Sequence, residues 1–258
     1  MTLVGRTAVI TGGGRGVGAA VAEQLAGNGA AVLLAARTAS EVERVAASLR
    51  AKGGTAHATT CDVADPASIE RLSATARERL GHIDILVNNA GVAFGAPIHK
   101  TSLEDWTRVL TVNATGAFLC LKTFLPGMAE RRWGRVVNVA SIAAVTGSRY
   151  MGAYAASKHA LLGLTRAAAA EVADRGVTVN AVCPGYLKTE MTSETIARIV
   201  QTTGRTEEQA LEAILQTTPQ RRLIEADEVA EAVLYLCGEG ARGVTGSALI
   251  IDGGELRR

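Results

Sequence analysis

The sequence has few aromatic residues and a nearly balanced charge. Aromatic side chains make up 3% of the 258 residues, and the formal net charge is +2. Proteins that bind single-stranded nucleic acid stack bases on aromatic side chains, and a basic surface attracts nucleic acid or an anionic membrane. The composition therefore argues against a nucleic-acid partner and a membrane partner.

The cysteines form neither a disulfide framework nor a metal site in the sequence pattern. There is no C-x-x-C pair and no neighbouring histidine, and all of them stand in apolar surroundings: Cys61, Cys120, Cys183 and Cys237. Isolated cysteines of this kind are usually buried, reduced thiols. We expect no disulfide and no bound metal.

The sequence also lacks a targeting or membrane-spanning signal. A strand pattern begins a few residues after Met1, which leaves no room for a basic region followed by the apolar core of a signal peptide. No apolar run approaches the roughly 18 residues of a membrane span. We expect a cytoplasmic protein.

Short apolar runs alternate with longer helical patterns along the whole chain. Strands are predicted at 7–10, 31–35, 55–60, 84–87, 135–140, 177–182 and 248–251, and helices at 17–27, 41–52, 67–80, 103–125, 154–174 and 227–236. Nearly continuous apolar strands that alternate with helices indicate a parallel sheet covered on both faces. The sequence predicts one α/β domain over 1–258, doubly wound with about seven strands, in which 186–223 is an insertion that covers the substrate.

A glycine-rich turn follows the first predicted strand. Residues 11–18 read TGGGRGVG and open the first predicted helix. Glycines permit positive φ and close approach of a pyrophosphate, and a helix N-terminus offers free N–H groups. The G-x-G-x-x-G/A pattern of dinucleotide sites fits only in the register Gly14, Gly16, Ala19. A dinucleotide site is predicted, and a simple glycine turn is the alternative.

The end of the second predicted strand indicates which dinucleotide binds. An NAD site has an acidic residue there, which holds the ribose 2′-hydroxyl. This sequence instead has Arg37 and no carboxylate at that place, and Arg15 in the glycine turn could reach the same group. Arginine suits a 2′-phosphate, so we predict NADP(H). Two arginines that only face water, with NAD as the cofactor, remain the alternative.

Tyr154 and Lys158 stand four residues apart in a predicted helix and therefore share a face. A nearby ammonium favours the phenolate and lowers a tyrosine pKa that is otherwise about 10. The pair is a candidate general acid/base, with Ser141 upstream of it. A Tyr-x-x-x-Lys pattern also arises by chance on a solvated helix face.

Several motifs together resemble the short-chain dehydrogenase/reductase family, in its compact single-domain branch. In chain order they are TGGGRGVG at 11–18, CDV at 61–63, NNAG at 88–91, Asn113 within VLTVNATG, Ser141, YAASK at 154–158 and VNAVCPGYLKT at 179–189. The resemblance implies a Rossmann-type fold and an enzyme that interconverts a ketone and a secondary alcohol by hydride transfer to or from a nicotinamide cofactor.

The resemblance also implies roles for individual residues. Tyr154 would exchange the proton with the substrate oxygen, Ser141 would donate a hydrogen bond to that oxygen, and Lys158 would hold the nicotinamide ribose and keep the pKa of Tyr154 low. Asn113 would hold a water that links Lys158 to solvent. The cofactor would contact Gly12, Arg15, Gly16, Val17, Gly18, Arg37, Asp62, Val63, Asn89, Ala90, Gly91, Tyr154, Lys158, Pro184, Gly185, Leu187 and Thr189. Asn88 is expected to be structural, and Asp62 has the alternative role of capping its own turn.

Three segments are expected to border the substrate: 92–101, 142–153 and 186–222. Candidate apolar wall residues are Val145, Tyr150, Met151, Tyr186 and Met191, and cations that could attract an acyl thioester's phosphates, or only form a solvated rim, are His99, Lys100, Arg149, Lys188, Arg221 and Arg222. The insertion is loosely similar to family members that act on 3-oxoacyl or 3-hydroxyacyl thioesters or on cyclic and polyketide ketones. The resemblance further implies a homotetramer formed through the helices at 103–125 and 154–174.

Two functions other than an NADP(H)-dependent reductase remain consistent with the sequence. One is an NAD-dependent alcohol dehydrogenase of the same family, and the other is a regulator that binds NADP(H) without turnover. The combination of Ser141, Tyr154 and Lys158 favours an enzyme, since a sensor does not need all three side chains.

Overall fold

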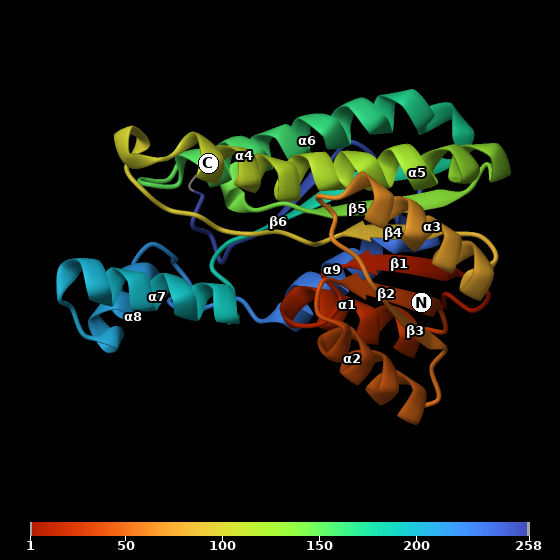
Figure 1. Cartoon of the computed structure of the whole chain (residues 1–258), viewed down its shortest axis with the longest axis horizontal. Coiled ribbons are helices and arrows are strands. Elements are labelled where there is room, and N and C mark those ends of the chain that lie inside the picture. The colour runs from red at the N-terminus through yellow and green to blue at the C-terminus, as the bar shows by residue number, and fades with distance from the viewer. Residues whose placement is uncertain (1, 257–258) are drawn as a thin grey trace.

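A computed structural model of the chain describes residues 2–256. Its centre is one parallel sheet of seven strands in the order β3-β2-β1-β4-β5-β6-β7 (Figure 1). The strands are β1 (Thr7–Thr11), β2 (Ala31–Ala36), β3 (Ala56–Thr60), β4 (Ile85–Asn88), β5 (Gly134–Val139), β6 (Val177–Pro184) and β7 (Ala248–Ile251). The predicted seven-stranded, doubly wound parallel sheet is confirmed.

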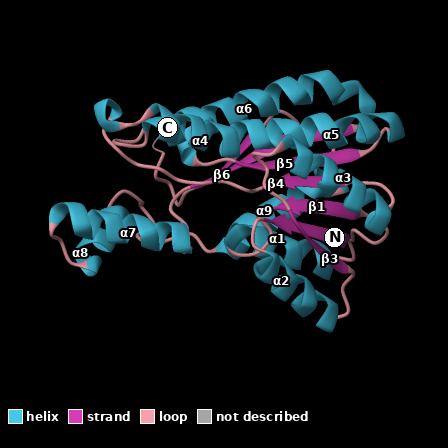
Figure 2. Ribbon diagram, in the orientation of Figure 1, coloured by secondary structure: helices cyan, strands magenta, loops and turns pink. Residues whose placement is uncertain are grey.

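Helices cover both faces of the sheet, as Figure 2 shows. One layer contains α1 (Gly16–Gly27), α2 (Ala39–Ala51) and α9 (Ala226–Cys237), and the other contains α3 (Pro66–Leu80), α4 (Leu103–Leu110), α5 (Gly116–Arg131) and α6 (Gly152–Val172). Each layer packs its apolar side chains onto the sheet, which produces two main core clusters. Every residue of β1, β5 and β6 is buried, as expected for central strands covered on both sides.

The strand order reverses direction at β1, which pairs with β2 on one side and β4 on the other. Such a switch point leaves a crevice at the carboxyl ends of the two diverging strands, where ligands of α/β proteins bind. The glycine turn follows β1 and the Asn89-Ala90-Gly91 segment follows β4, so both open into this crevice. The side chain of Asn89 joins them by donating to the carbonyl oxygens of Thr11 and Gly12, each at 3.0 Å.

The helical stretch Leu103–Arg131 contains a π-helical turn, η2 (Thr111–Thr115), between α4 and α5. Such turns commonly lie at functional sites, and this one carries Asn113. By length and composition alone the stretch could cross a membrane, a test that core helices of soluble proteins also pass. Here it packs beside α3 and α6 in one layer of the domain.

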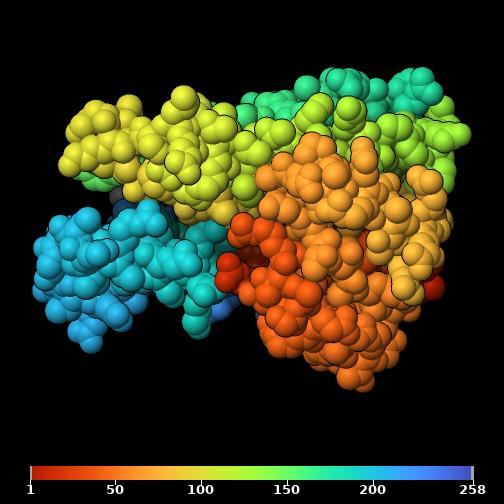
Figure 3. Space-filling model, in the orientation of Figure 1, coloured from red at the N-terminus to blue at the C-terminus, as the bar shows by residue number. Residues whose placement is uncertain are grey.

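The insertion between β6 and α9 forms two helices, α7 (Glu190–Thr203) and α8 (Glu207–Leu215). Its two ends are held together, since the Ile224 N–H donates to Tyr186 O and the Lys188 N–H donates to Ile224 O, both at 2.9 Å. In Figure 3 the two helices form a separate lobe, with a hollow between it and the segment that follows β4. The segment between β6 and α9 is therefore a helical lobe whose two ends are bonded to each other.

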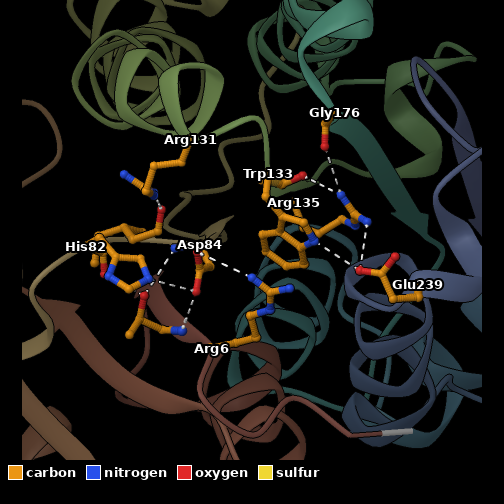
Figure 4. Close-up of polar contacts among 11 residues, drawn as sticks. Arg6, His82, Asp84, Arg131, Trp133, Arg135, Gly176 and Glu239 are labelled. Atoms are coloured by element: carbon orange, nitrogen blue, oxygen red, sulfur yellow. Dashed lines mark hydrogen bonds and ion pairs between the residues drawn. The ribbon is translucent and has the colours of Figure 1, made fainter.

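The amino ends of the strands carry a polar cluster around Trp133 (Figure 4). The guanidinium carbons of Arg6 and Arg135 lie 3.6 and 4.5 Å from the centroid of its indole ring. Glu239 accepts from the Trp133 indole N–H at 3.0 Å and from the nearly buried Arg135 at 3.4 Å. Cation–π contacts and charge-assisted hydrogen bonds thus fasten the end of the sheet opposite the crevice.

Short helical turns complete the connections: η1 (Ile98–Lys100), η3 (Ile142–Ala144), η4 (Ala173–Arg175) and η5 (Glu239–Ala241). All four cysteines are buried as free thiols, as predicted. Within residues 2–256, no group of histidine, cysteine and acidic side chains is arranged to hold a metal ion.

Candidate active site

Four candidate catalytic residues come from three segments at the carboxyl edge of the sheet. Tyr154 and Lys158 lie on consecutive turns of α6, Ser141 follows β5, and Asn113 lies in η2. The Lys158 ammonium is 5.7 Å from the centroid of the Tyr154 ring, so the predicted shared helix face is present. The structure brings together residues that are up to 45 positions apart in the chain.

Lys158 is buried, with 4% of its surface exposed, and its ammonium donates to the main-chain oxygen of Val139 at 2.9 Å. Burial disfavours the charged form and lowers the pKa of Lys158 to about 8. Gly91, after β4, lies beside the same ammonium, because a Cβ on this residue would be 3.6 Å from Nζ. Lys158 therefore carries its proton near neutral pH inside a pocket formed by α6, β5 and the turn after β4.

The pKa of Tyr154 differs from the sequence prediction. Burial raises the pKa of the Tyr154 phenol, and its hydrogen bond with Ser141 only partly opposes that effect. The predicted lowering by Lys158 is wrong for the cofactor-free protein: the ammonium is directed to Val139, and loss of solvent penalises the phenolate more. Tyr154 consequently keeps its proton at neutral pH, which is the state that a proton donor requires.

Ser141 lies at the entrance to η3 in extended backbone geometry, next to Tyr154. Its hydroxyl oxygen accepts from the Ala143 N–H at 3.1 Å. A hydroxyl can accept and donate at the same time, so the Ser141 hydrogen is still available to donate a second hydrogen bond. Ser141 is thus oriented by its own turn toward the side chain that completes the site.

The carboxamide of Asn113 is fully engaged inside the protein. Its oxygen accepts from the Val92 N–H at 2.8 Å, and its nitrogen donates to Val92 O and to the Ser157 hydroxyl, each at 2.9 Å. Both N–H groups of the amide are therefore used. The carboxamide nitrogen therefore has no hydrogen left to donate to the expected water.

The glycine turn has the shape that a dinucleotide phosphate needs. Gly12 and Gly16 have φ of 66° and 50°, and a Cβ on Gly18 would lie 2.1 Å from the oxygen of Gly12. The first turn of α1 has no acidic residue and no side-chain cap, so its N–H groups are free to face an anion. Val17 is buried under this turn. These residues fit the pyrophosphate of a dinucleotide.

The two predicted phosphate-binding arginines have different surroundings. Arg37 follows β2, is exposed, and its side chain makes no hydrogen bond or ion pair within residues 2–256. Arg15 instead pairs with Glu190, the first residue of α7. Arg44 on α2 donates to Gly14 O at 3.2 Å and so binds the glycine turn to α2.

The remaining predicted cofactor residues line the same crevice or its approach. Asp62 accepts from the Ala64 N–H at 3.0 Å, so one carboxylate oxygen caps its own turn, and Val63 is buried beside Gly116. Asn88 bonds the buried Asn138 at 2.9 Å, in keeping with its structural interpretation. Pro184 is the last residue of β6, the turn after it contains Gly185, Leu187 and Thr189, and the Thr189 methyl lies 3.6 Å from a Cβ built on Gly16.

The three segments expected around the substrate meet at the hollow of Figure 3. The Ala96 N–H donates to Tyr150 O at 2.7 Å, and Arg198 of α7 donates to Gly95 O at 3.4 Å. Tyr150 has a φ of 66°, a strained value for a bulky residue that is more common at functional sites. Of the proposed wall residues, Val145, Tyr150 and Met191 are exposed, and Met151 and Tyr186 are half-buried.

Most cations predicted at the rim already have partners. Ion pairs join Lys188 to Glu225 at 3.2 Å, Arg221 to Glu212 at 3.5 Å and Arg222 to Glu228. Arg149 donates to the Tyr150 hydroxyl at 3.0 Å, and His99 and Lys100 are exposed on η1. The paired cations hold the base of the insertion, which favours the rim interpretation for these three residues.

Comparison with known proteins identifies the family. The family described as short chain dehydrogenase matches residues 6–199. This chain is a short-chain dehydrogenase/reductase. It is 38% identical over 252 residues to D-beta-hydroxybutyrate dehydrogenase of Rhizobium meliloti (strain 1021), covering 96% of this chain and 98% of that protein. It is 39% identical over 249 residues to granaticin polyketide synthase putative ketoacyl reductase 1 of Streptomyces violaceoruber, covering 96% and 92%.

A solved structure agrees with the sequence relatives. A variant of actinorhodin polyketide ketoreductase, crystallised with NADPH, superposes with a TM-score of 0.95 at 38% identity and covers 98% of each chain. Membership in the short-chain dehydrogenase/reductase family makes the protein an oxidoreductase that acts on the ketone/alcohol pair.

Two residues in the site were not singled out in the sequence. Ser157 bonds Asn113, and Glu190 bonds Arg15. A serine within a helix commonly donates to a main-chain oxygen one turn back. The position of Ser157, three residues after Tyr154 and one before Lys158, could therefore have indicated a contact with the turn that carries both residues. Nothing in the sequence pairs residues 15 and 190, because that contact depends on how the insertion folds over the glycine turn.

The lowered pKa of Lys158 predicts how the stability of the cofactor-free protein depends on pH. An unfolded lysine has a pKa of about 10.4, so between pH 8 and 10 the unfolded chain binds more protons than the folded one. The contribution of Lys158 to the free energy of unfolding should therefore rise with pH from about 8 to 9.5, so urea denaturation should show this free energy increasing relative to that of Lys158→Met over the same range. Equal slopes for the two proteins would show that Lys158 is not desolvated.

Proposed function

We propose that the protein is a cytoplasmic, NADP(H)-dependent ketone reductase. Its proposed substrate is a 3-oxoacyl thioester, with the 3-hydroxyacyl thioester as product, or a related cyclic or polyketide ketone. The proposed unit is a single domain, 1–258, in which 186–223 closes over a small-molecule substrate. The catalytic residues are Asn113, Ser141, Tyr154 and Lys158.

The cofactor preference rests mainly on Arg37. This exposed arginine follows β2, beside the glycine turn, where a carboxylate would hold the 2′-hydroxyl of NAD. Its guanidinium is free of internal partners within residues 2–256, so a 2′-phosphate can bind it in a bidentate manner without displacing another group. The NADPH present in the actinorhodin ketoreductase structure supports this preference.

The proposed chemistry divides between the cofactor and the protein. NADPH, when bound, supplies the hydride that adds to the carbonyl carbon. Ser141 donates a hydrogen bond to the carbonyl oxygen, and Tyr154 transfers its phenolic proton to the same oxygen as negative charge develops there. Lys158 is close enough to stabilise the phenolate that remains. The π-helical turn at Asn113 would supply a main-chain carbonyl for the water that returns a proton.

The substrate class rests on relatives and on the apolar rim. One relative bears the name D-beta-hydroxybutyrate dehydrogenase, in which the reacting oxygen is on the third carbon of an acyl chain, and another is named a putative ketoacyl reductase. Val145, Tyr150 and Met191 offer exposed apolar surface at the hollow for such a chain. A panel of acyl thioesters, cyclic ketones and alcohols, assayed with NADPH and NADH by absorbance, tests the class directly.

We further propose a homotetramer built through α4, α5 and α6. The outer surface of the α4–α5 stretch exposes three large apolar residues, Leu103, Trp106 and Phe118. On α6 the exposed and half-buried alanines are small enough for a second helix to pack closely: Ala155, Ala156, Ala160, Ala167 and Ala170, whereas Ala168 and Ala169 of the predicted set face the core of the chain. A second copy would remove these surfaces from water, a state that light scattering on the purified protein measures.

Replacing Arg37 should separate the two cofactors. Arg37→Ala removes the charge that faces the 2′-phosphate, so the Kd for NADPH should rise about tenfold or more while the Kd for NADH changes little. Fluorescence titration with both cofactors measures this, and Arg50→Ala at the far end of α2 is the matched control. An equal loss for both cofactors would place the 2′-phosphate site elsewhere.

Replacing Tyr154 should stop turnover without preventing cofactor binding. Tyr154→Phe removes the transferable proton and keeps the ring, so kcat should fall by at least about 100-fold while the Kd for NADPH stays within a few-fold. Tyr235→Phe, an exposed tyrosine on α9, is the control. Retained turnover in Tyr154→Phe would reject the mechanism, and NADPH binding without turnover by the unaltered protein would favour a sensor.

A further inference from the structure

Ser157 is a completely buried serine between the two catalytic residues of α6. It has no exposed surface and lies one position before Lys158. Its hydroxyl donates to the main-chain oxygen of Tyr154 at 2.7 Å and accepts from Asn113 Nδ2 at 2.9 Å. The only hydroxyl hydrogen of Ser157 is therefore used in the bond to Tyr154 O on α6, and its oxygen accepts the hydrogen bond from the Asn113 side chain.

The Ser157 hydroxyl completes the set of partners of Asn113. The other N–H and the oxygen of this amide bind Val92, so three elements meet at one buried carboxamide: η2, the turn after β4, and α6. Asn113 itself is 1% exposed. A buried amide N–H that loses its acceptor is costly, so the whole arrangement favours one position of α6 relative to η2.

We infer that Ser157 is a positioning residue for the reaction. Through Asn113 it fixes the turn of α6 that carries Tyr154 and Lys158 against η2 and the turn after β4, where the nicotinamide end and the substrate meet. Ser157 does not touch the reacting atoms. The expected effect on the reaction rate rests on the proposed function. The expected effect on the position of α6 rests only on the structure.

The same helix contains a natural comparison two turns further on. Thr165 is also completely buried, donates to Leu161 O at 2.8 Å and accepts from Asn138 Nδ2 at 2.8 Å. Asn138 in turn bonds Asn88, at the centre of the sheet. Thr165 therefore makes the same pair of hydrogen bonds as Ser157, and none of its partners belongs to the proposed catalytic set.

The geometric test uses the cofactor-free protein and amide hydrogen exchange. In Ser157→Ala the Asn113 carboxamide loses one anchor, so the Val92 N–H that it holds should exchange about tenfold faster or more. Thr165→Val removes the comparable hydroxyl, so it should lower the stability of the folded protein about as much as Ser157→Ala does. It should not accelerate the exchange of the Val92 N–H beyond that general loss of stability. Equal Val92 exchange in the two variants, after correction for overall stability, would overturn the inference.

The kinetic test asks whether the change reaches the proton-transfer step. Ser157→Ala should lower kcat about tenfold with the KM for NADPH within about twofold, and should raise the solvent deuterium isotope effect on kcat. Thr165→Val should leave the isotope effect at the level of the unaltered protein. An unchanged isotope effect and kcat in Ser157→Ala would contradict the inference. If the unaltered protein reduced no carbonyl, the proposed function would fail, and the Val92 exchange result would still decide the geometry.

Discussion

The burial of the Lys158 ammonium is the interaction on which the rest of the site depends. A charged group this far from solvent needs a partner, and the main-chain oxygen of Val139 supplies one at 2.9 Å. That bond ties α6 to β5, the strand that also leads into Ser141. The same cation then faces Tyr154 on its own helix and Gly91 after β4. One buried charge thus lies where the segments that carry Tyr154, Ser141 and Gly91 meet.

The sheet topology explains why these segments converge. The carboxyl ends of β1 and β4 diverge into helices on opposite faces, and the crevice between them receives the glycine turn and the Asn89-Ala90-Gly91 segment. The opposite end of the sheet is closed by the cluster of Arg6, Trp133, Arg135 and Glu239.

Local sequence patterns predicted the fold and led to the site residues proposed above, but they did not predict how those residues interact. Apolar runs separated by helical patterns predicted all seven strands, and the four-residue spacing of Tyr154 and Lys158 predicted their shared face. The raised pKa of Tyr154 was not predictable, because it depends on how deeply the fold buries the phenol and on the charges that Tyr186 and Cys183 can bring near it. The Asn113–Ser157 and Arg15–Glu190 contacts join residues 44 and 175 positions apart, and no pattern in the sequence encodes either pairing.

The most direct measurement of the central claim follows the hydride itself. NADPH that carries deuterium at both C4 positions is incubated with the protein and a 3-oxoacyl thioester or a cyclic ketone, and the product is analysed by mass spectrometry and NMR. The account predicts one deuterium on the carbinol carbon of the alcohol, with the hydroxyl proton drawn from solvent. An alcohol without deuterium at that carbon, or NADPH that binds and is never oxidised by any carbonyl in the panel, would contradict it.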